Sequence, residues 1–168
     1  KNLKWWCSEK DRGQSHAINK GLEHASGKVF SWINSDDALL PGALHIVSEA
    51  FAQDPDLLIF EGIRMVRQKD GTGEPLPLDI LSQTDALYHS PKINQQSTFY
   101  ALDKVKEIGG VDEALKYVMD HELWLQFLFR YVDKFSDFDQ ALPMKAATTS
   151  SSSTPEDQAD PSFATTLA

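Results

Sequence analysis

Apolar residues in the first third of the chain alternate between helical and strand-like spacing. Residues 14–25 predict a helix with apolar positions every three to four residues, and Gly27 takes the usual place of a helix-ending glycine. The β-rich run 29–33 predicts a buried strand, Pro41 predicts the first turn of a second helix, and residues 57–60 predict another strand. This alternation predicts an α/β sheet with at least partly parallel strands.

The pattern is less regular in the rest of the chain. Residues 5–13 predict a short strand that runs into a loop, and the glycines and prolines of residues 68–77 predict a surface loop. Residues 97–101 predict a strand, and the apolar stripe of residues 119–131 predicts a strong helix.

The last 23 residues differ in composition from everything before them. Ten of the residues 146–168 are Ser or Thr and none is basic, so we expect this segment to be a disordered tail. The domain organisation predicted is one folded domain over residues 1–145, followed by the Ser/Thr-rich tail.

Composition excludes some classes of function and names none. The apolar fraction of 41% and the charged fraction of 24% are ordinary for a soluble domain. A net charge of −9 and the lack of a Lys/Arg stripe argue against nucleic acid as a partner. Cys7 is the single cysteine, which rules out an internal disulfide and favours a reducing compartment. We therefore expect a cytoplasmic protein.

An acidic turn follows the predicted strand 29–33. Asp36 and Asp37 fall in the sequence Asn34-Ser35-Asp36-Asp37, and ligands of open α/β sheets bind at the carboxyl ends of strands. Two carboxylates there can hold a hard divalent cation, which would neutralise a diphosphate. An ordinary acidic turn at the entrance to the next helix would look the same.

A third carboxylate of interest lies near the start of the helix predicted over 119–131. Asp120 is one turn before Leu123 and Trp124, on the inward face of the apolar stripe. A carboxylate in that position can take a proton from a hydroxyl in a cleft. The alternative is that Asp120 caps the helix N-terminus.

Two blocks of the sequence resemble glycosyltransferase family 2. The first is residues 6–21, followed at the family's spacing by Asn34-Ser35-Asp36-Asp37 and by residues 41–44. The second joins residues 94–100, 108–113 and 119–125, which are similar to the family's acceptor half. The resemblance runs from about Trp5 to Phe138.

This resemblance implies an α/β fold of the GT-A type, a Rossmann-like mixed sheet flanked by helices. It implies a nucleotide-diphosphate sugar as donor, in the first place a UDP-sugar, a saccharide or lipid-linked acceptor, Mn²⁺ or Mg²⁺ as cofactor, and transfer with inversion. Asp37 would bind the metal, Asp36 would assist it or contact the ribose, and Asp120 would be the catalytic base. Further candidates for binding the donor are Asp11, Gln14 and Asn19.

The resemblance also leads us to expect a chain that lacks the family's first strands. Strand 29–33 would then expose an edge or a face and invite self-association. In a longer protein, peripheral attachment to the membrane is an option. Two other classes stay open: a non-catalytic remnant of the fold that acts as a binding or interaction domain, and, with weaker support, a metal-dependent phosphohydrolase.

Overall fold

The computed structural model describes residues 3–67, 73–76, 93–131, 144–147 and 163–167. Its main feature is a five-stranded sheet in the order β6-β2-β5-β1-β7. The strands are β1 (Val29–Ile33), β2 (Ile59–Gly62), β5 (Thr98–Ala101), β6 (Met144–Ala147) and β7 (Phe163–Leu167). Only β5 runs antiparallel to its neighbours, whereas β6 is parallel to β2 and β7 is parallel to β1. The predicted mixed sheet is confirmed.

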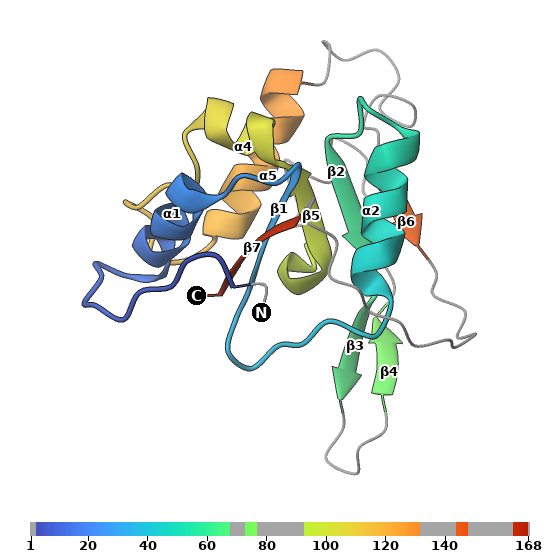
Figure 1. Ribbon diagram of the computed structural model, residues 1–168, viewed down its shortest axis with the longest axis horizontal. Helices are drawn as coiled ribbons and strands as arrows, with labels where there is room; N and C mark the ends of the chain where they lie inside the picture. The colour runs from blue at the N-terminus through green and yellow to red at the C-terminus, as the bar shows by residue number, and fades with distance from the viewer. Residues whose placement is uncertain (1–2, 68–72, 77–92, 132–143, 148–162, 168) are drawn as a thin grey trace.

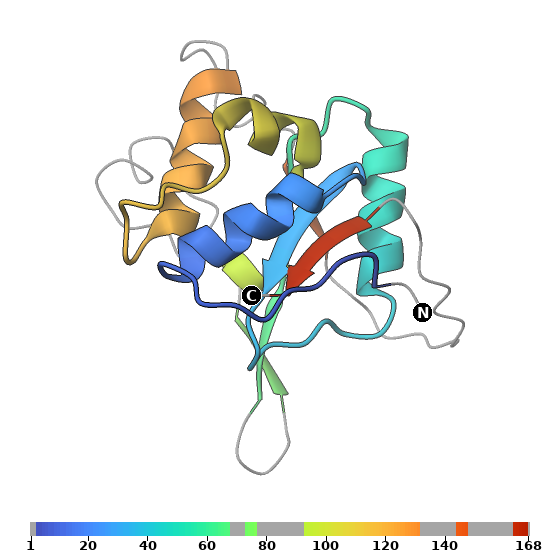
Figure 2. The same ribbon diagram turned by 60° about the vertical axis from the view of Figure 1, so that its left-hand side comes forward.

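Helices cover both faces of this sheet (Figures 1 and 2). Helices α1 (Gln14–His24), α4 (Leu102–Ile108) and α5 (Met119–Tyr131) pack on one face, around Phe30, Trp32 and Tyr100. Helix α2 (Ala43–Gln53) packs on the other face, against Val29, Phe60 and Phe99. The α/β architecture flanked by helices is therefore as predicted, and it leaves the carboxyl ends of β1 and β2 at one edge of the sheet.

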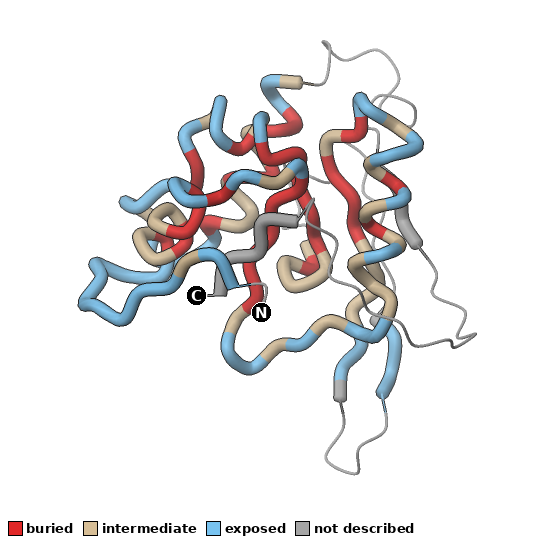
Figure 3. The backbone as a smooth tube through the Cα atoms, in the orientation of Figure 1, coloured by how far each residue is buried: buried red, intermediate tan, exposed pale blue. Residues whose placement is uncertain are grey.

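The interior strand β1 is buried along its whole length (Figure 3). All five of its residues are buried, because successive side chains point to opposite faces and each face is covered by helices. Such a strand is a rigid base for the residues that follow it. None of the helices in the described part of the chain has both the length and the hydropathy to cross a membrane.

A two-stranded hairpin lies apart from the main sheet (Figure 1). Strands β3 (Arg64–Arg67) and β4 (Gly73–Leu76) pair antiparallel, and Pro75 is paired with Met65. The surface loop predicted over residues 68–77 is therefore wrong for 73–76, while residues 68–72 and residue 77 lie outside the described part. Glycine and proline disfavour regular structure, but an edge strand can still form over 73–76 because residues 64–67 pair with it.

Helix α4 has no counterpart in the sequence prediction. It has only two turns, too short for its apolar spacing to show above the strand that precedes it. Gly109 ends it at a φ of 100°, with its N–H 3.1 Å from the carbonyl oxygens of both Val105 and Lys106. A glycine suits this left-handed position because it has no Cβ.

One predicted strand and two predicted helix boundaries differ from the structure. Residues 5–13 form no strand; instead the Trp5 ring stacks on His24 with centroids 4.1 Å apart. Helix α1 ends at His24, and Ala25 after it is already extended, so Gly27 is not the residue that ends the helix. Pro41 lies in a turn before α2, which begins at Ala43 after Gly42 in a left-handed conformation. Each boundary depends on local packing that residue type does not encode.

The C-terminal strands change two further predictions. Strand β7 pairs in parallel with β1, and helices cover both faces, so β1 exposes neither an edge nor a face. The predicted self-association through it loses its basis. Residues 163–167 are a strand rather than part of a disordered tail, and β6 crosses the predicted boundary at residue 145. Residues 148–162 lie outside the described part, so the division into a domain and a tail stays a prediction.

Candidate active site

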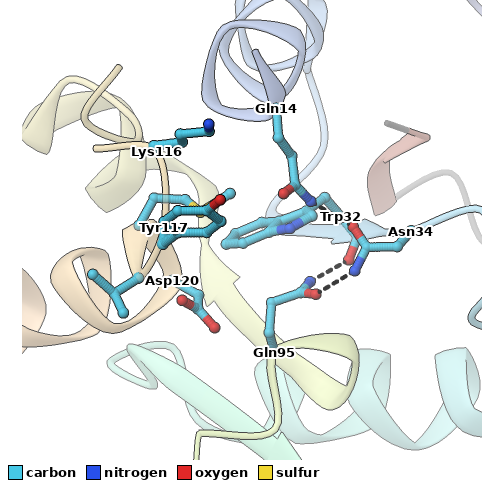
Figure 4. A pocket seen from close by; sticks show the side chains of 9 residues that line it. Gln14, Trp32, Asn34, Gln95, Lys116, Tyr117 and Asp120 are labelled. Carbon is cyan, nitrogen blue, oxygen red and sulfur yellow. Dashed lines mark hydrogen bonds between the residues drawn. The ribbon is translucent and has the colours of Figure 1, made fainter. Parts of the chain in front are cut away.

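A pocket opens at the edge of the sheet where β1 ends (Figure 4). Its volume is about 210 Å³, and four segments line it: the start of α1, the end of β1, the 3₁₀ turn η1 (Gln95–Ser97), and the residues that lead into α5. The lining residues are Gln14, Trp32, Asn34, Gln95, Lys116, Tyr117, Val118, Met119 and Asp120. This is the edge at which ligands of α/β sheets bind.

One side of the pocket is made of three side-chain amides, which we call the amide wall: Gln14, Asn34 and Gln95. Gln14 Nε2 donates to Asn34 Oδ1 at 2.7 Å, and Asn34 Nδ2 donates to Gln95 Oε1 at 3.1 Å. Gln95 Nε2 in turn donates to the backbone carbonyl of Trp32 at 2.7 Å. The three amides therefore form one hydrogen-bonded chain across α1, β1 and η1.

The acidic turn is connected to this amide wall. The Asp37 N–H donates to the Asn34 carbonyl at 3.1 Å and closes the turn, while Asn34 Nδ2 donates to Asp37 Oδ2 at 3.3 Å. Asp37 is half-buried and Asp36 is exposed. Asn34 thus holds the carboxylate of Asp37, and Asp36 extends toward solvent.

The residues of the acidic turn fit a divalent cation that shares its ligands with a substrate. Within the described ranges, no group of three or more His, Cys, Asp or Glu side chains could hold an ion by itself. Mg²⁺ is usually bound through one or two carboxylates together with substrate phosphates, rather than in an all-protein cage. Asp37, with Asp36 beside it, supplies a donor set of that kind.

The opposite side of the pocket is the segment that leads into α5, which we call the loop wall: residues 116–120. Lys116 and Tyr117 are exposed, with the ammonium 5.6 Å from the ring centroid. Val118 has a φ of 59°, a left-handed conformation that is strained for a β-branched residue. Such strain often accompanies functional sites.

Asp120 is the second residue of α5 and lines the pocket. The alternative that it caps the helix is therefore wrong, because the capping position precedes Met119. Among the described residues, no hydrogen bond or ion pair engages the side chains of Lys116, Tyr117 or Asp120. In Figure 4 the Asp120 carboxylate faces the pocket across from Gln95. Its lone pairs are available to a ligand.

Trp32 lines the pocket between these two walls, and Tyr100 packs against it outside the lining. Trp32 and Tyr100 stack with ring centroids 6.4 Å apart and planes at 5°, and both are buried. Burial raises the pKa of the Tyr100 hydroxyl, and the charges of Asp120 and Glu61 raise it further. Tyr100 is therefore protonated and neutral in the folded protein.

Asp11 and Asn19, like Asp36 and Asp37 of the acidic turn, lie outside the pocket lining. Asp11 Oδ1 accepts from the Gly13 N–H at 3.0 Å, in the turn before α1. The Asn19 amide brackets Val111: its Nδ2 donates to the Val111 carbonyl at 2.9 Å, and its Oδ1 accepts from the Val111 N–H at 3.0 Å. Both side chains serve local structure here, and their roles in donor binding stay predictions.

The structure brings Gln14 and Asp120 to one pocket and links Asp37 to it through Asn34. It adds lining residues that the sequence prediction did not single out, above all Asn34, Gln95 and Lys116. Asn34 is adjacent to the predicted carboxylates, so the acidic turn itself was a signal for it. Gln95 lies about sixty positions further along the chain, and only the antiparallel return of β5 places it here.

The sequence model of glycosyl transferase family 2 matches residues 7–108, more than half of the chain. The chain belongs to this family. The matched region includes α1, β1, the acidic turn, β2, η1 and β5, and thus all of the amide wall.

Similar proteins are also glycosyltransferases by name. An uncharacterized glycosyltransferase of Rickettsia typhi is 27% identical over 129 residues, which are 69% of this chain and 39% of the relative. One of Rickettsia prowazekii is 26% identical over 140 residues, covering 76% of this chain and 42% of the relative. One of Mycobacterium tuberculosis is 27% identical over 125 residues, covering 73% and 47%. The chain spans about two fifths to one half of these relatives' lengths.

Proposed function

We propose that this chain carries the sugar-transfer site of a metal-dependent, inverting glycosyltransferase. The donor is a nucleotide-diphosphate sugar, in the first place a UDP-sugar, and the acceptor is a saccharide or a lipid-linked saccharide. The observation that carries the proposal is the pocket itself. It sets the carboxylate of Asp120, which has no hydrogen-bond partner among the described residues, opposite an amide wall that holds Asp37.

In this proposal Asp120 is the catalytic base. A carboxylate oxygen of Asp120 takes the proton of an acceptor hydroxyl, and the hydroxyl oxygen bonds to the anomeric carbon of the donor. The bond between that carbon and the diphosphate oxygen breaks on the opposite side, so the configuration inverts and the nucleoside diphosphate leaves. The apolar ring of Trp32, which lines the pocket and is backed by Tyr100, would keep water away from the reacting groups.

Asp37, assisted by Asp36, would hold Mn²⁺ or Mg²⁺. When bound there, the cation would supply positive charge for the departing diphosphate. Lys116 is a second cation on the rim of the pocket, placed to contact a phosphate oxygen. Localisation in the cytoplasm, with access to a membrane in a longer protein, is part of the same proposal.

A transfer screen tests the function directly. The longest natural protein that contains this chain would be incubated with Mn²⁺ and five donors, and nucleoside diphosphate release would be measured with methyl glycosides as acceptors. The donors are UDP-glucose, UDP-galactose, UDP-N-acetylglucosamine, GDP-mannose and dTDP-rhamnose. We expect one of these donors to be consumed in a manner that depends on both the metal and an acceptor.

Asp120→Asn and Asp103→Asn are a matched pair, because each aspartate is the second residue of its helix. Both changes remove a similar helix-dipole interaction, but only Asp120 lines the pocket. We expect Asp120→Asn to lower transfer by roughly 10²- to 10⁴-fold at unchanged donor affinity, and Asp103→Asn to leave it intact. Equal turnover in both variants would contradict a base role. Donor binding without any transfer by the natural protein would instead indicate the non-catalytic alternative.

A further inference from the structure

The hydrogen bonds along the amide wall run in one donor-to-acceptor direction, which the Trp32 carbonyl fixes at one end. The Trp32 carbonyl can only accept a hydrogen bond, so Gln95 must turn its NH₂ group toward it, at 2.7 Å. Gln95 Oε1 then faces Asn34, which must present its own NH₂ group. Each amide thus determines which way the next one faces, because every NH₂ group must meet an oxygen.

The direction continues to the mouth of the pocket. Asn34 Nδ2 donates to both Gln95 and Asp37. The Oδ1 atom of Asn34 therefore faces the other way and accepts from Gln14 Nε2 at 2.7 Å. Gln14 therefore keeps Oε1 as an unused acceptor, since no donor of the described residues reaches it. Figure 4 shows this oxygen turned toward the loop wall, on the side of Lys116 and Tyr117.

Buried groups hold the fixed end in place. Glu61 is 7% exposed, and its Oε1 accepts the Asn94 N–H at 3.1 Å. The Asn94 carbonyl accepts from the Thr98 hydroxyl at 2.8 Å and from the Ser97 N–H at 2.8 Å. These bonds pin the residue before Gln95 to strands β2 and β5. The amide wall is therefore anchored in the core and reaches outward to the ligand.

We propose that Gln95 and Asn34 are positioning residues whose amide chain fixes Gln14 Oε1 as an acceptor for a substrate hydroxyl, and fixes Asp37 at the same time. This rests on the proposed function of the pocket and names one specificity contact within it. The ligand chemistry is a sugar hydroxyl, from the donor or from the acceptor. Asn34 Nδ2 donates to both Gln95 and Asp37, so the same side chain positions the amide wall and the carboxylate of the acidic turn.

The first test reads the amide chain without turnover. Gln95→Met removes both of its hydrogen bonds at similar volume, and Gln96→Met is the matched control, because Gln96 lies in the same 3₁₀ turn but does not line the pocket. Solvent exchange of the side-chain NH₂ protons of Asn34 and Gln14 would be followed by NMR. We expect roughly tenfold faster exchange in Gln95→Met only, as for loss of one hydrogen bond. Equal exchange rates in both variants would overturn the proposal.

The second test uses the donor that is consumed in the transfer screen. Gln14→Met and Gln95→Met should each raise a KM by roughly 3- to 10-fold at nearly constant kcat and melting temperature, with Gln96→Met unchanged. A rise in the KM of the nucleotide sugar assigns the hydroxyl to the donor, and a rise in the KM of the methyl glycoside assigns it to the acceptor. Unchanged KM values for both substrates in Gln14→Met would overturn the proposed contact. If no donor is consumed, the proposed function fails, whereas the exchange experiment still decides whether the amide chain exists.

Discussion

The two walls of the pocket are built in different ways. Every amide of the amide wall is hydrogen-bonded to the next, and the last is bonded to a backbone carbonyl of the buried strand β1. The loop wall offers a cation, an exposed ring and a carboxylate, whose side chains make no hydrogen bond or ion pair with other described residues. One wall is fixed by its own contacts, and the other presents free groups.

This difference corresponds to two chemical tasks. A residue that holds a metal or reads a hydroxyl needs a fixed orientation, because hydrogen bonds and metal coordination weaken quickly with angle and distance. A base must keep its lone pairs free until the acceptor hydroxyl arrives, so Asp120 benefits from having no partner. Four substitutions probe the contrast.

Gly110→Ala should have the largest effect on the loop wall. Gly110 has a φ of 85°, and a Cβ there would collide with Asn19 Oδ1 and Leu22, which disturbs the bracket on Val111 that precedes the loop wall. We expect a loss of roughly 2–4 kcal/mol in the free energy of unfolding, measured with denaturant. Gly109→Ala is the control, because its φ of 100° is also strained but no atom lies near the added Cβ. Gly109→Ala should lower the free energy of unfolding by only about 1–2 kcal/mol. An equal loss in the two variants would show that the hydrogen bonds between Asn19 and Val111 are unimportant.

Asp37→Asn should weaken the amide wall's metal site. We expect the affinity for the consumed nucleotide sugar in Mn²⁺ to fall by roughly 10- to 100-fold, measured by calorimetry, because a ligand charge is lost. Without metal, the variant and the natural protein should bind equally. Asp36→Asn should have the smaller effect, since Asp36 is exposed and Asn34 does not hold it. An affinity that ignores Mn²⁺ in the natural protein would rule out the metal role.

Val118→Gly should stabilise the protein slightly by releasing strain in the loop wall. A left-handed conformation costs a residue with a Cβ about 1–2 kcal/mol, and glycine gives back part of this in chain entropy. The expected gain is roughly 0.5–1 kcal/mol, or about 1–4 °C in melting temperature. Val118→Ala keeps the Cβ and should gain less. A loss of stability in Val118→Gly would mean that the backbone is not strained there.

Glu61→Gln should change the pH dependence of stability and little else. Burial raises the pKa of Glu61 above its ordinary value of 4.5, and the Asn94 N–H offsets part of this. The folded protein then holds the proton more tightly than the unfolded chain, so this group's contribution to stability is full below pH 4.5 and falls as the pH rises through the folded pKa. Glutamine keeps the acceptor for Asn94 and removes this slope. Melting curves from pH 4 to 8 would show it, and an unchanged slope would contradict it.

Local sequence predicted the features that depend on local periodicity and residue type. Strand β1 and helices α1 and α5 lie where the apolar spacing put them, because each buries apolar residues at the period of its own element. Helix α4 and hairpin strand β4 were missed, since a two-turn helix and a Gly/Pro-containing strand carry little signal of their own. Helix α4 forms because it buries Leu102 and Val105 in the core, and β4 forms because it pairs with β3.

The sequence by itself determined the family, the mixed α/β architecture and three chemical candidates that meet or adjoin one pocket: Gln14, Asp37 and Asp120. Only the tertiary structure decided which polar residues join them. Asn19 and Asp11 are engaged in local hydrogen bonds, whereas Gln95 arrives from a distant segment because β5 returns antiparallel beside β1. Residue types fix which groups can donate or accept, but the pairing of strands fixes which of them lie within hydrogen-bond distance of each other.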